Sequence, residues 1–340
     1  MLLAAPLGAL AFTLLATSLL VAWAGAPVGR AYALLLDGGF GSRFAVAETL
    51  TRATPLILTG LAAAVAFRAR LYNIGAEGQL YAGAIAAVAV GGLHGGVGFD
   101  LHPWLLWPLM VACAMTAGAL LLLGPALMKR LGVDEVVTTL LLNFVVLLAV
   151  SALLDGPMKD PSALGWPQSV ALQDALQLDR LIERSRVHTG LLAALVLALA
   201  LWALLKYTTT GFEIRAVGAN ARAAAFAGMP VGWVTVKVAL LSGALAGLAG
   251  AVEVAGRAHY VTLDMSPGYG YSGIVIAMLA MLNPLGVVAA AVFVAGILVG
   301  ADSMSRAVGV PTYIADVIVS VALIAMLVAT MLTQYRVRWS

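Results

Sequence analysis

Residues Gly211–Pro230 read GFEIRAVGANARAAAFAGMP, a polar, glycine-punctuated segment between two long apolar runs. Its run of small residues, Ala223–Ala227, is followed by Gly228 and Pro230, which favour the end of a helix. The pattern predicts a short surface helix with a turn before it. Two interpretations stay open: the small residues let a partner protein approach closely, or the segment is a solvated connector.

The composition around this segment is that of a membrane protein. The chain has 340 residues, of which 62% are hydrophobic and 10% charged, and its mean hydropathy is +1.01. These values exclude a soluble domain with a polar surface. We therefore expect one all-α, polytopic transmembrane domain over residues 1–340. The net charge of +3 suits a membrane surface rather than nucleic acid. The single cysteine, Cys113, lies in an apolar run and is interpreted as packing.

A membrane-spanning helix needs roughly 20 apolar residues to cross about 30 Å of hydrocarbon. The apolar runs predict about ten such helices, and the first is interpreted as a retained span rather than a signal peptide. Residues 25–43 are expected to be a loop, and 155–187 an extracytoplasmic loop with an amphipathic helix. The run 271–282 is either a short tilted span or a re-entrant half-helix. The predicted spans are 2–24, 44–67, 73–93, 103–127, 136–154, 188–206, 234–254, 271–282, 287–300 and 312–332.

The positions of basic residues predict the orientation. Cytoplasmic segments of membrane proteins carry an excess of Lys and Arg. This excess places both termini and the loop 207–233 in the cytoplasm, opposite the loop 155–187. The basic residues on the predicted cytoplasmic side are Arg68, Arg70, Lys129, Arg130, Lys206, Arg215, Arg222, Lys237, Arg336 and Arg338.

A weak internal repeat is present. LTGLAAAVAF begins at Leu58 and LSGALAGLAGAV at Leu241, and each is followed by a glycine-rich polar turn and another apolar helix. On the predicted topology the two copies run in opposite directions, as in the inverted repeats of transporters. Chance matching of alanine- and glycine-rich spans is the alternative. The stripe of Ser242, Gly243, Gly247 and Gly250 favours close helix packing.

Several polar residues fall within predicted spans. An ionisable group such as Glu77 is costly in a membrane unless it faces water or a partner, so it is a candidate functional residue. The alternative is that Glu77 caps a helix or pairs with Arg68 or Arg70. For Asn143 a hydrogen bond between helices is favoured. Glu48 with Arg52 and Glu253 with Arg257 are spaced for local ion pairs, although a gating role stays open.

Motifs of catalysis are missing from the sequence. It contains no Walker-type loop, no His-Glu-x-x-His motif and no serine nucleophile elbow. We therefore expect no catalytic residues, no metal site and no cofactor in this chain.

Four segments together resemble a known family: NIGAEGQ (73–79), EVVTTLLLN (135–143), GFEIRAVGANARAAAFAGM (211–229) and YSGIVIAMLAMLNPLG (271–286). They resemble the permease subunits of bacterial ABC importers of the branched-chain amino acid, ribose and nucleoside group. The first two segments look most like the nucleoside (guanosine-type) and simple-sugar branch. The resemblance covers nearly the whole chain.

The resemblance implies a type II importer-like fold in the bacterial cytoplasmic membrane. It also implies a second permease subunit, identical or different, two cytoplasmic ATPase subunits that bind ATP, and an extracytoplasmic substrate-binding lipoprotein. The polar loop would be the coupling helix that docks in an ATPase groove. The matching residues are Glu213, Arg215, Gly218, Asn220, Ala223 and Gly228. Ala221 and Arg222 depart from the Asn-Pro pair that is common there, so the start of the helix can differ.

The expected function is import of nucleosides. A nucleoside is neutral and carries a π-face and hydroxyl groups, so aromatic and amide side chains should line its path. The predicted substrate-path residues are Asn73, Glu77, Gln79 and Asn143. Import of a simple sugar such as ribose, or of branched-chain amino acids, is the alternative within the family. An ion-coupled secondary transporter that uses Glu77 is the alternative from another class, and a membrane-embedded enzyme lacks a visible catalytic cluster.

Overall fold

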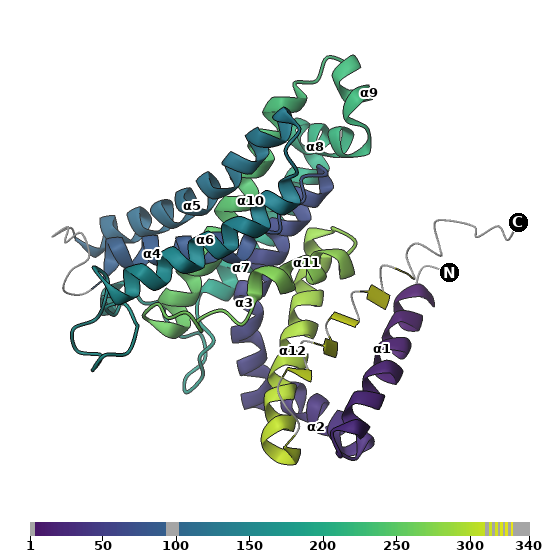
Figure 1. The fold of residues 1–340 in the computed structure, drawn as a ribbon, viewed down its shortest axis with the longest axis vertical. Helices are drawn as coiled ribbons and strands as arrows, with labels where there is room; N and C mark the ends of the chain where they lie inside the picture. The colour runs from purple at the N-terminus through teal and green to yellow at the C-terminus, as the bar shows by residue number, and fades with distance from the viewer. Residues whose placement is uncertain are drawn as a thin grey trace, which may run out of the picture. The chain divides into compact units, whose positions relative to one another are not determined.

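The computed structural model describes residues 4–92 and 102–309, with a few positions between 313 and 328. Its regular elements are helices, as predicted, and its only extended pairings in these residues are isolated bridges. The α-helices are α1 (Ala4–Trp23), α2 (Val28–Phe40), α3 (Arg43–Arg68), α4 (Ala76–Gly91), α5 (Pro103–Met128), α6 (Glu135–Asp155), α7 (Gly190–Tyr207), α8 (Thr209–Ala219), α9 (Ala221–Phe226), α10 (Val231–Glu253), α11 (Tyr269–Leu279) and α12 (Pro284–Val308) (Figure 1). A π-helical turn, Val254–Ala258, extends α10.

Six of the described helices are long and apolar enough to cross a membrane: α3, α5, α6, α7, α10 with its π-helical turn, and α12. The pair α1 and α2, bent by 114°, gives a seventh if it counts as one broken span. The chain is therefore a multi-pass membrane protein. α4 has 16 residues and α11 has 11, so both are short for a crossing. The predicted last span, 312–332, lies largely outside the described residues.

Two sequence predictions about loops are wrong. Residues 25–43 are mostly helix α2, because Ala31, Leu35 and Gly39 recur every four residues and form one buried face. In the segment 155–187 the leucines at helical spacing do not form an amphipathic helix. Its backbone donors instead pair with the π-helical turn of α10 and the residues after it, as in Leu178 N–H to Ala255 O at 2.8 Å and Leu172 N–H to His259 O at 2.7 Å.

The described chain divides into two compact units. The smaller unit comprises described residues of 1–53 and 289–340. In it, Gly39 of α2 lies against the backbone of Gly296 in α12, since a Cβ on Gly39 would be 2.4 Å from the Gly296 carbonyl oxygen. Arg52 pairs with Glu48 at 3.7 Å, as predicted, and with Asp302 at 2.5 Å.

The larger unit, residues 54–288, is organised around α10. An apolar 18-residue stretch of α10 is 83% buried, whereas the corresponding stretch of α6 is 17% buried. Small residues allow this packing, because a Cβ on Gly83 of α4 would be 2.0 Å from the carbonyl oxygen of Gly247, and one on Gly118 of α5 would be 2.2 Å from that of Gly243. Close helix packing at the Ser242–Gly250 stripe is thus confirmed.

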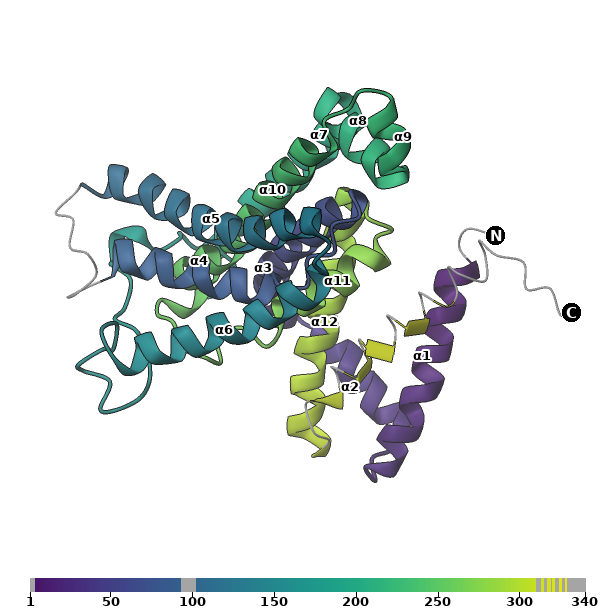
Figure 2. The same cartoon turned by 45° about the horizontal axis from the view of Figure 1, so that its top comes forward.

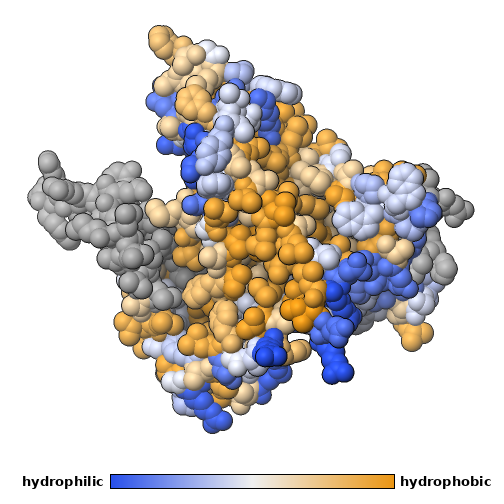
Figure 3. All heavy atoms as spheres, turned by 180° about the vertical axis from the view of Figure 1, so that it is seen from behind, coloured by the Kyte–Doolittle hydropathy of each residue, from blue (hydrophilic) through white to orange (hydrophobic). Residues whose placement is uncertain are grey.

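The larger unit has two polar ends. At one end α8 and α9 project beyond α7 and α10 (Figure 2), and a Cβ on Gly218 would be 1.8 Å from the Arg68 carbonyl oxygen. At the other end the segment 156–189 pairs with the loop that follows α10. At the top of Figure 3, over α8 and α9, hydrophilic residues alternate with apolar ones, and the surface below them is largely hydrophobic.

Candidate functional site

The first turns of α4 and α11 meet inside the larger unit. The backbone N–H of Gly270 donates to Glu77 Oε2 at 2.6 Å, and a Cβ on Gly270 would lie 2.2 Å from the Glu77 backbone nitrogen. Glu77 is 3% exposed. A carboxylate at a helix N-terminus is stabilised by the partial positive charge of that terminus, and here two termini face the same carboxylate. Glu77 therefore caps the start of α11, in line with the capping alternative from the sequence, and does not pair with Arg68 or Arg70.

This meeting point lies at the start of α4, far from the other end of the helix. The 16 residues of α4 span about 24 Å at 1.5 Å per residue. Glu77 is in the first turn, roughly 20 Å from the other end of the helix at Gly91. Since the hydrocarbon core of a membrane is about 30 Å thick, the starts of both short helices lie within the membrane if Gly91 is near its surface.

An amide pair fixes the turn that leads into α4. Asn73 Nδ2 donates to Gln79 Oε1 and Gln79 Nε2 donates to Asn73 Oδ1, each at 2.9 Å. Asn73 Nδ2 also donates to Ser242 Oγ of α10 at 3.1 Å, and Ser242 Oγ donates to the Ala62 carbonyl of α3 at 2.8 Å. Asn73, Gln79 and Ser242 are at most 2% exposed. The turn before α4 is thereby bonded to α10 and, through Ser242, to α3.

Asn143 joins three elements. Its Oδ1 accepts from the Gly78 N–H at 2.8 Å, and its Nδ2 donates to the Ile74 carbonyl at 2.9 Å and to the Tyr271 hydroxyl at 3.0 Å. The predicted hydrogen bond between helices is confirmed. Tyr271 was not among the predicted site residues, although an aromatic residue beginning a short apolar helix is a visible signal. Tyr271 is 37% exposed, while its hydroxyl is bonded to Asn143.

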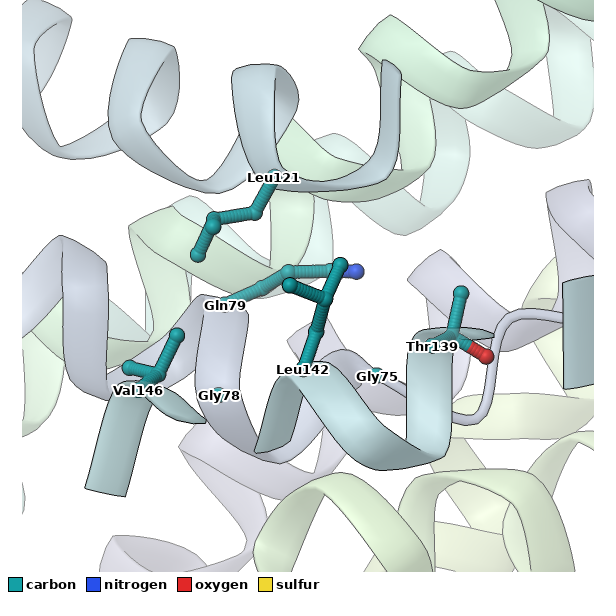
Figure 4. Close-up of a pocket in the computed structure, with 7 residues that line it drawn as sticks. All are labelled: Gly75, Gly78, Gln79, Leu121, Thr139, Leu142 and Val146. Carbon is teal, nitrogen blue, oxygen red and sulfur yellow. The ribbon is translucent and has the colours of Figure 1, made fainter. Parts of the chain in front are cut away.

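Figure 4 shows Gln79 extending between Leu121 of α5 and Thr139 and Leu142 of α6. The hollow that these side chains line with Gly75, Gly78 and Val146 has no room for a water molecule. The structure thus brings Asn73, Glu77, Gln79 and Asn143 together around the starts of α4 and α11. Their place on a substrate path stays a prediction.

The polar segment 211–230 forms two helices at a different end of the unit. The turn predicted before the surface helix is in fact helix α8, whose residues Gly211, Ile214, Val217 and Gly218 are buried. α9 begins at Asn220, whose Oδ1 accepts from the N–H groups of Arg222 at 3.0 Å and Ala223 at 3.1 Å. Gly228 ends the segment with a φ of +81°. Asn220 caps the start of α9 with these two hydrogen bonds, and Ala221 stands in place of the proline expected there from the resemblance.

The predicted coupling residues divide into two groups. Glu213 pairs with Lys237 of α10 at 3.3 Å, and Gly218 is a buried residue of α8 that lies against the Arg68 backbone, so these two attach the segment to the unit. The other four are exposed to solvent: Arg215, Asn220, Ala223 and Gly228. Phe226 was not predicted, yet its side chain is 97% exposed on α9. A single large apolar residue in a run of alanines was the available signal.

Charged residues at the opposite end pair as predicted. Arg257 donates to Glu253 Oε1 at 2.7 Å and lies 3.3 Å from the Tyr269 hydroxyl. Glu253 is fully buried at the end of α10. No cluster of three or more His, Cys, Asp or Glu side chains that could hold a metal ion occurs among the described residues.

Comparison with known proteins relates this architecture to transport. The family described as branched-chain amino acid transport system / permease component matches residues 45–327. The guanosine ABC transporter permease protein NupP of Bacillus subtilis is 36% identical over 322 residues, which cover 94% of this chain and 91% of that protein. A glucose ABC transporter permease of Haloferax volcanii is 36% identical over 318 residues, covering 90% of this chain and 82% of that protein. The nucleoside ABC transporter permease protein NupB of Lactococcus lactis is 30% identical over 297 residues, covering 84% and 80% respectively.

Proposed function

The chain belongs to the family of branched-chain amino acid transport permease components, and from this premise we propose that it forms the membrane path of an ATP-driven nucleoside importer. The observation that carries the proposal is the 36% identity to a guanosine permease over 94% of this chain. A nucleoside permease of a second organism supports the same substrate class. The similarity to a glucose permease favours import of a simple sugar as the second candidate.

As a permease, the chain supplies a path and no catalytic residue. We assign ATP binding and hydrolysis to two cytoplasmic ATPase subunits, substrate delivery to an extracytoplasmic binding lipoprotein, and the other wall of the path to a second permease subunit. The exposed apolar faces of the lipid-facing helices accommodate the bilayer or the second permease. α6 is the clearest example, since its apolar window is only 17% buried.

The segment α8–α9 is the proposed contact with the ATPase. α8 is fixed to the unit by the Glu213–Lys237 pair and by its packing on Arg68, so a force applied to α9 reaches α3 and α10. α9 offers small side chains and one large apolar one, Phe226, which suit docking into a groove. Basic residues at this end support a cytoplasmic location: Arg68, Arg70, Lys129, Lys206, Arg215, Arg222 and Lys237.

Hydrogen bonds between the two repeat segments support the inverted repeat. Thr59 and Ser242 occupy the same place in the matching segments that begin at Leu58 and Leu241. Thr59 Oγ1 donates to the Tyr269 carbonyl, at the start of α11, at 2.9 Å. Ser242 Oγ accepts from Asn73, before the start of α4, at 3.1 Å. In each of the two matching segments, the hydroxyl at the second position therefore bonds to the start of the short helix that follows the other segment.

The starts of those short helices also correspond. Gly75 and Gly268 are their N-cap residues. Asn73 and Ser266 lie two residues before these caps, and each side-chain oxygen accepts from a backbone N–H at 3.0 Å, that of Gly75 and that of Tyr269. With α4, α11 and the last apolar run counted as crossings, ten membrane passages follow. In transporters with inverted repeats, substrate sites lie near the membrane midplane at broken helices.

Asn73, Glu77, Gln79 and Asn143 are the proposed substrate-path residues in this arrangement. Tyr271 adds an exposed aromatic side chain beside the amide of Asn143. An aromatic face with a neighbouring amide suits a nucleobase, which can stack and form hydrogen bonds. ATP-driven movement of α8 and α9 would expose this region to alternate sides of the membrane.

Uptake by cells with and without this chain, with its partner subunits present, tests the proposal. One labelled nucleoside is competed in turn by other nucleosides, free bases, ribose, glucose and branched-chain amino acids. Competition by nucleosides alone supports the proposal, and uptake of a sugar in place of nucleosides favours the second candidate. Inhibition of the initial rate by vanadate, without an effect of a protonophore, separates an ATP-driven pump from an ion-coupled transporter.

A further inference from the structure

The first half of α6 carries a row of buried polar side chains. Glu135, Thr139 and Asn143 follow one another every fourth residue, so they share one face of the helix over about 12 Å. Their exposed fractions are 8%, 1% and 0%, although only 17% of the apolar stretch of α6 is buried. A helix that is mostly apolar and outward-facing thus turns its polar side chains inward, which indicates a specific partner on that face.

The partner of this row is the turn between α3 and α4, residues 69–75. Thr139 Oγ1 accepts from the Ile74 N–H at 3.2 Å, and Asn143 Nδ2 donates to the Ile74 carbonyl at 2.9 Å. Figure 4 shows Thr139 beside Gly75, and a Cβ on Gly75 would be 3.1 Å from the Thr139 carbonyl oxygen. Successive turns of α6 are therefore bonded to, or packed against, the segment that leads into the candidate site.

Lys129, directly after α5, extends the row to the end of α3. Its Nζ donates to the Arg70 carbonyl at 2.6 Å and to Glu135 Oε1, and we call this three-residue contact the latch. Arg70 has a φ of +54°, and its N–H and that of Leu71 donate back into the last turn of α3 at 3.0 Å each. This is a helix cap in which glycine is usual at the position of Arg70. A larger residue keeps that conformation only where its surroundings hold it, and Lys129 supplies such a contact.

α8 lies against the same cap of α3. A Cβ on Gly218 of α8 would be 1.8 Å from the Arg68 carbonyl oxygen and 3.3 Å from the Ala69 Cα. Asn73, whose amide is bonded to α10, follows Arg70 by only three residues. A displacement of α8 is therefore applied directly to the cap, at the point where the latch joins it to α6.

We propose that Lys129 and Glu135 are positioning residues, which latch the end of α3 to α6 so that a displacement of α8 moves α6 and the starts of α4 and α11 together. Asn143, about 12 Å along α6 from Glu135, carries the movement to Ile74 and to the Tyr271 hydroxyl of α11. Without the latch, the cap of α3 moves past α6 and ATP is hydrolysed without import. The inference rests on the proposed function, because it takes ATP-driven movement of α8 as its input.

The test measures ATP hydrolysis and nucleoside import side by side, with the full transport complex in proteoliposomes. Lys129→Met keeps the length of the side chain but removes its donor. It should lower the nucleoside imported per ATP hydrolysed by about fivefold or more, with hydrolysis within about twofold of the wild type. Glu135→Leu breaks the other half of the latch and should act in the same way, whereas Lys129→Arg keeps a charged donor and should retain most of the ratio. Lys206→Met is the matched control, because Lys206 lies over the rings of Trp202 and Tyr207 in its own helix.

Hydrogen exchange of residues 71–80 gives a second readout, which a merely structural role of the latch would not move. Exchange is compared between the nucleotide-free and the vanadate-trapped complex. Trapping should change the exchange of this segment in the wild type and leave it unchanged in Lys129→Met, while α8 and α9 respond in both. Gly118→Ala weakens the contact of α5 with α10 away from the latch, so it shows the effect of lower stability alone. It should keep both the import ratio and the exchange response.

The inference is overturned if import and hydrolysis fall in proportion in Lys129→Met, if both stay unchanged, or if Lys206→Met or Gly118→Ala lowers the ratio equally. An exchange response of residues 71–80 that persists in Lys129→Met, or that is missing from the wild type, also overturns it. Import of a sugar in place of nucleosides by the wild-type complex rejects the proposed substrate alone. In that case the ratio is measured with the sugar, and the latch is tested in the same way.

Discussion

The carboxylate of Glu77, in the first turn of α4, accepts a hydrogen bond of 2.6 Å from the backbone N–H of Gly270, in the first turn of α11. The two residues are 193 positions apart in the chain. Both helices are too short to cross a membrane unaided, so their starts need partners within it. The Glu77 side chain supplies one hydrogen-bond acceptor where the two helix starts meet.

Replacing Glu77 by alanine should therefore leave the Gly270 N–H unpaired in a buried place. We expect the transition temperature of the purified permease to fall, corresponding to roughly 1.5–3 kcal/mol, and nucleoside uptake to be lost. Glu77→Gln keeps an acceptor oxygen and should retain most of the stability. Thermal unfolding in detergent and uptake in cells measure the two effects. If Glu77→Gln is stable but abolishes protonophore-sensitive uptake, an ion-coupled mechanism is favoured instead.

The contact of α5 with α10 gives a second prediction. A Cβ on Gly118 would be 2.2 Å from the Gly243 carbonyl oxygen, whereas one on Gly124 of the same helix meets nothing within 4 Å. Gly118→Ala should destabilise the larger unit by about 1–3 kcal/mol through overpacking. Gly124→Ala is the control and should be neutral or slightly stabilising. Equal transition temperatures for the two variants would contradict the packing described for α10.

The sequence predicted the long helices well because their apolar runs end at charged residues or turns. Thus α6, from Glu135 to Asp155, lies within a residue of its predicted span at each end, 136–154. The role of Asn143 followed because an amide inside such a run needs a partner. Residues 155–187 misled the prediction, since leucine spacing alone does not reveal that Leu178 bonds to the π-helical turn at the end of α10 and Leu172 to His259, which follows it.

The candidate site was harder to predict for a physical reason. NIGAEGQ identified Asn73, Glu77 and Gln79 as unusual, but their partners Ser242 and Gly270 come from α10 and α11, far along the chain. Local pattern cannot give contacts between segments that are brought together only by folding.

Acid should weaken the end of the unit that carries His188. This side chain is 1% exposed, and burial, with His259 nearby, lowers its pKa to about 4 from the ordinary 6.5. Between these values the unfolded chain binds a proton that the folded chain excludes, so stability is complete above pH 6.5 and is lost as the pH falls towards 4. The difference corresponds to roughly 3 kcal/mol at most.

Thermal unfolding at pH 7.5 and at pH 5 measures this effect. His188→Gln, which cannot take up the proton, should flatten the pH dependence over that window. His102→Gln is the control, because His102 is exposed at the start of α5. A wild-type transition temperature that does not fall between pH 7.5 and pH 5 would show that His188 is protonated or solvated in the folded chain.

Phe226 should anchor the ATPase. Its side chain is 97% exposed on α9, so its removal leaves the packing of the permease unchanged. Large aromatic side chains that enter a pocket of a partner commonly contribute 2 kcal/mol or more to binding, about thirtyfold in affinity. We expect Phe226→Ala to weaken recovery of the ATPase subunits with the tagged permease and to reduce uptake, at an unchanged transition temperature. Leu164→Ala removes an equally exposed apolar side chain at the other end of the unit and should alter neither ATPase recovery nor uptake.

Glu213→Ala with Arg215→Ala should weaken coupling as well, because Glu213 joins α8 to Lys237. Full ATPase recovery and transport in Phe226→Ala, with loss only in the Glu213 and Arg215 variant, would move the contact from α9 to α8.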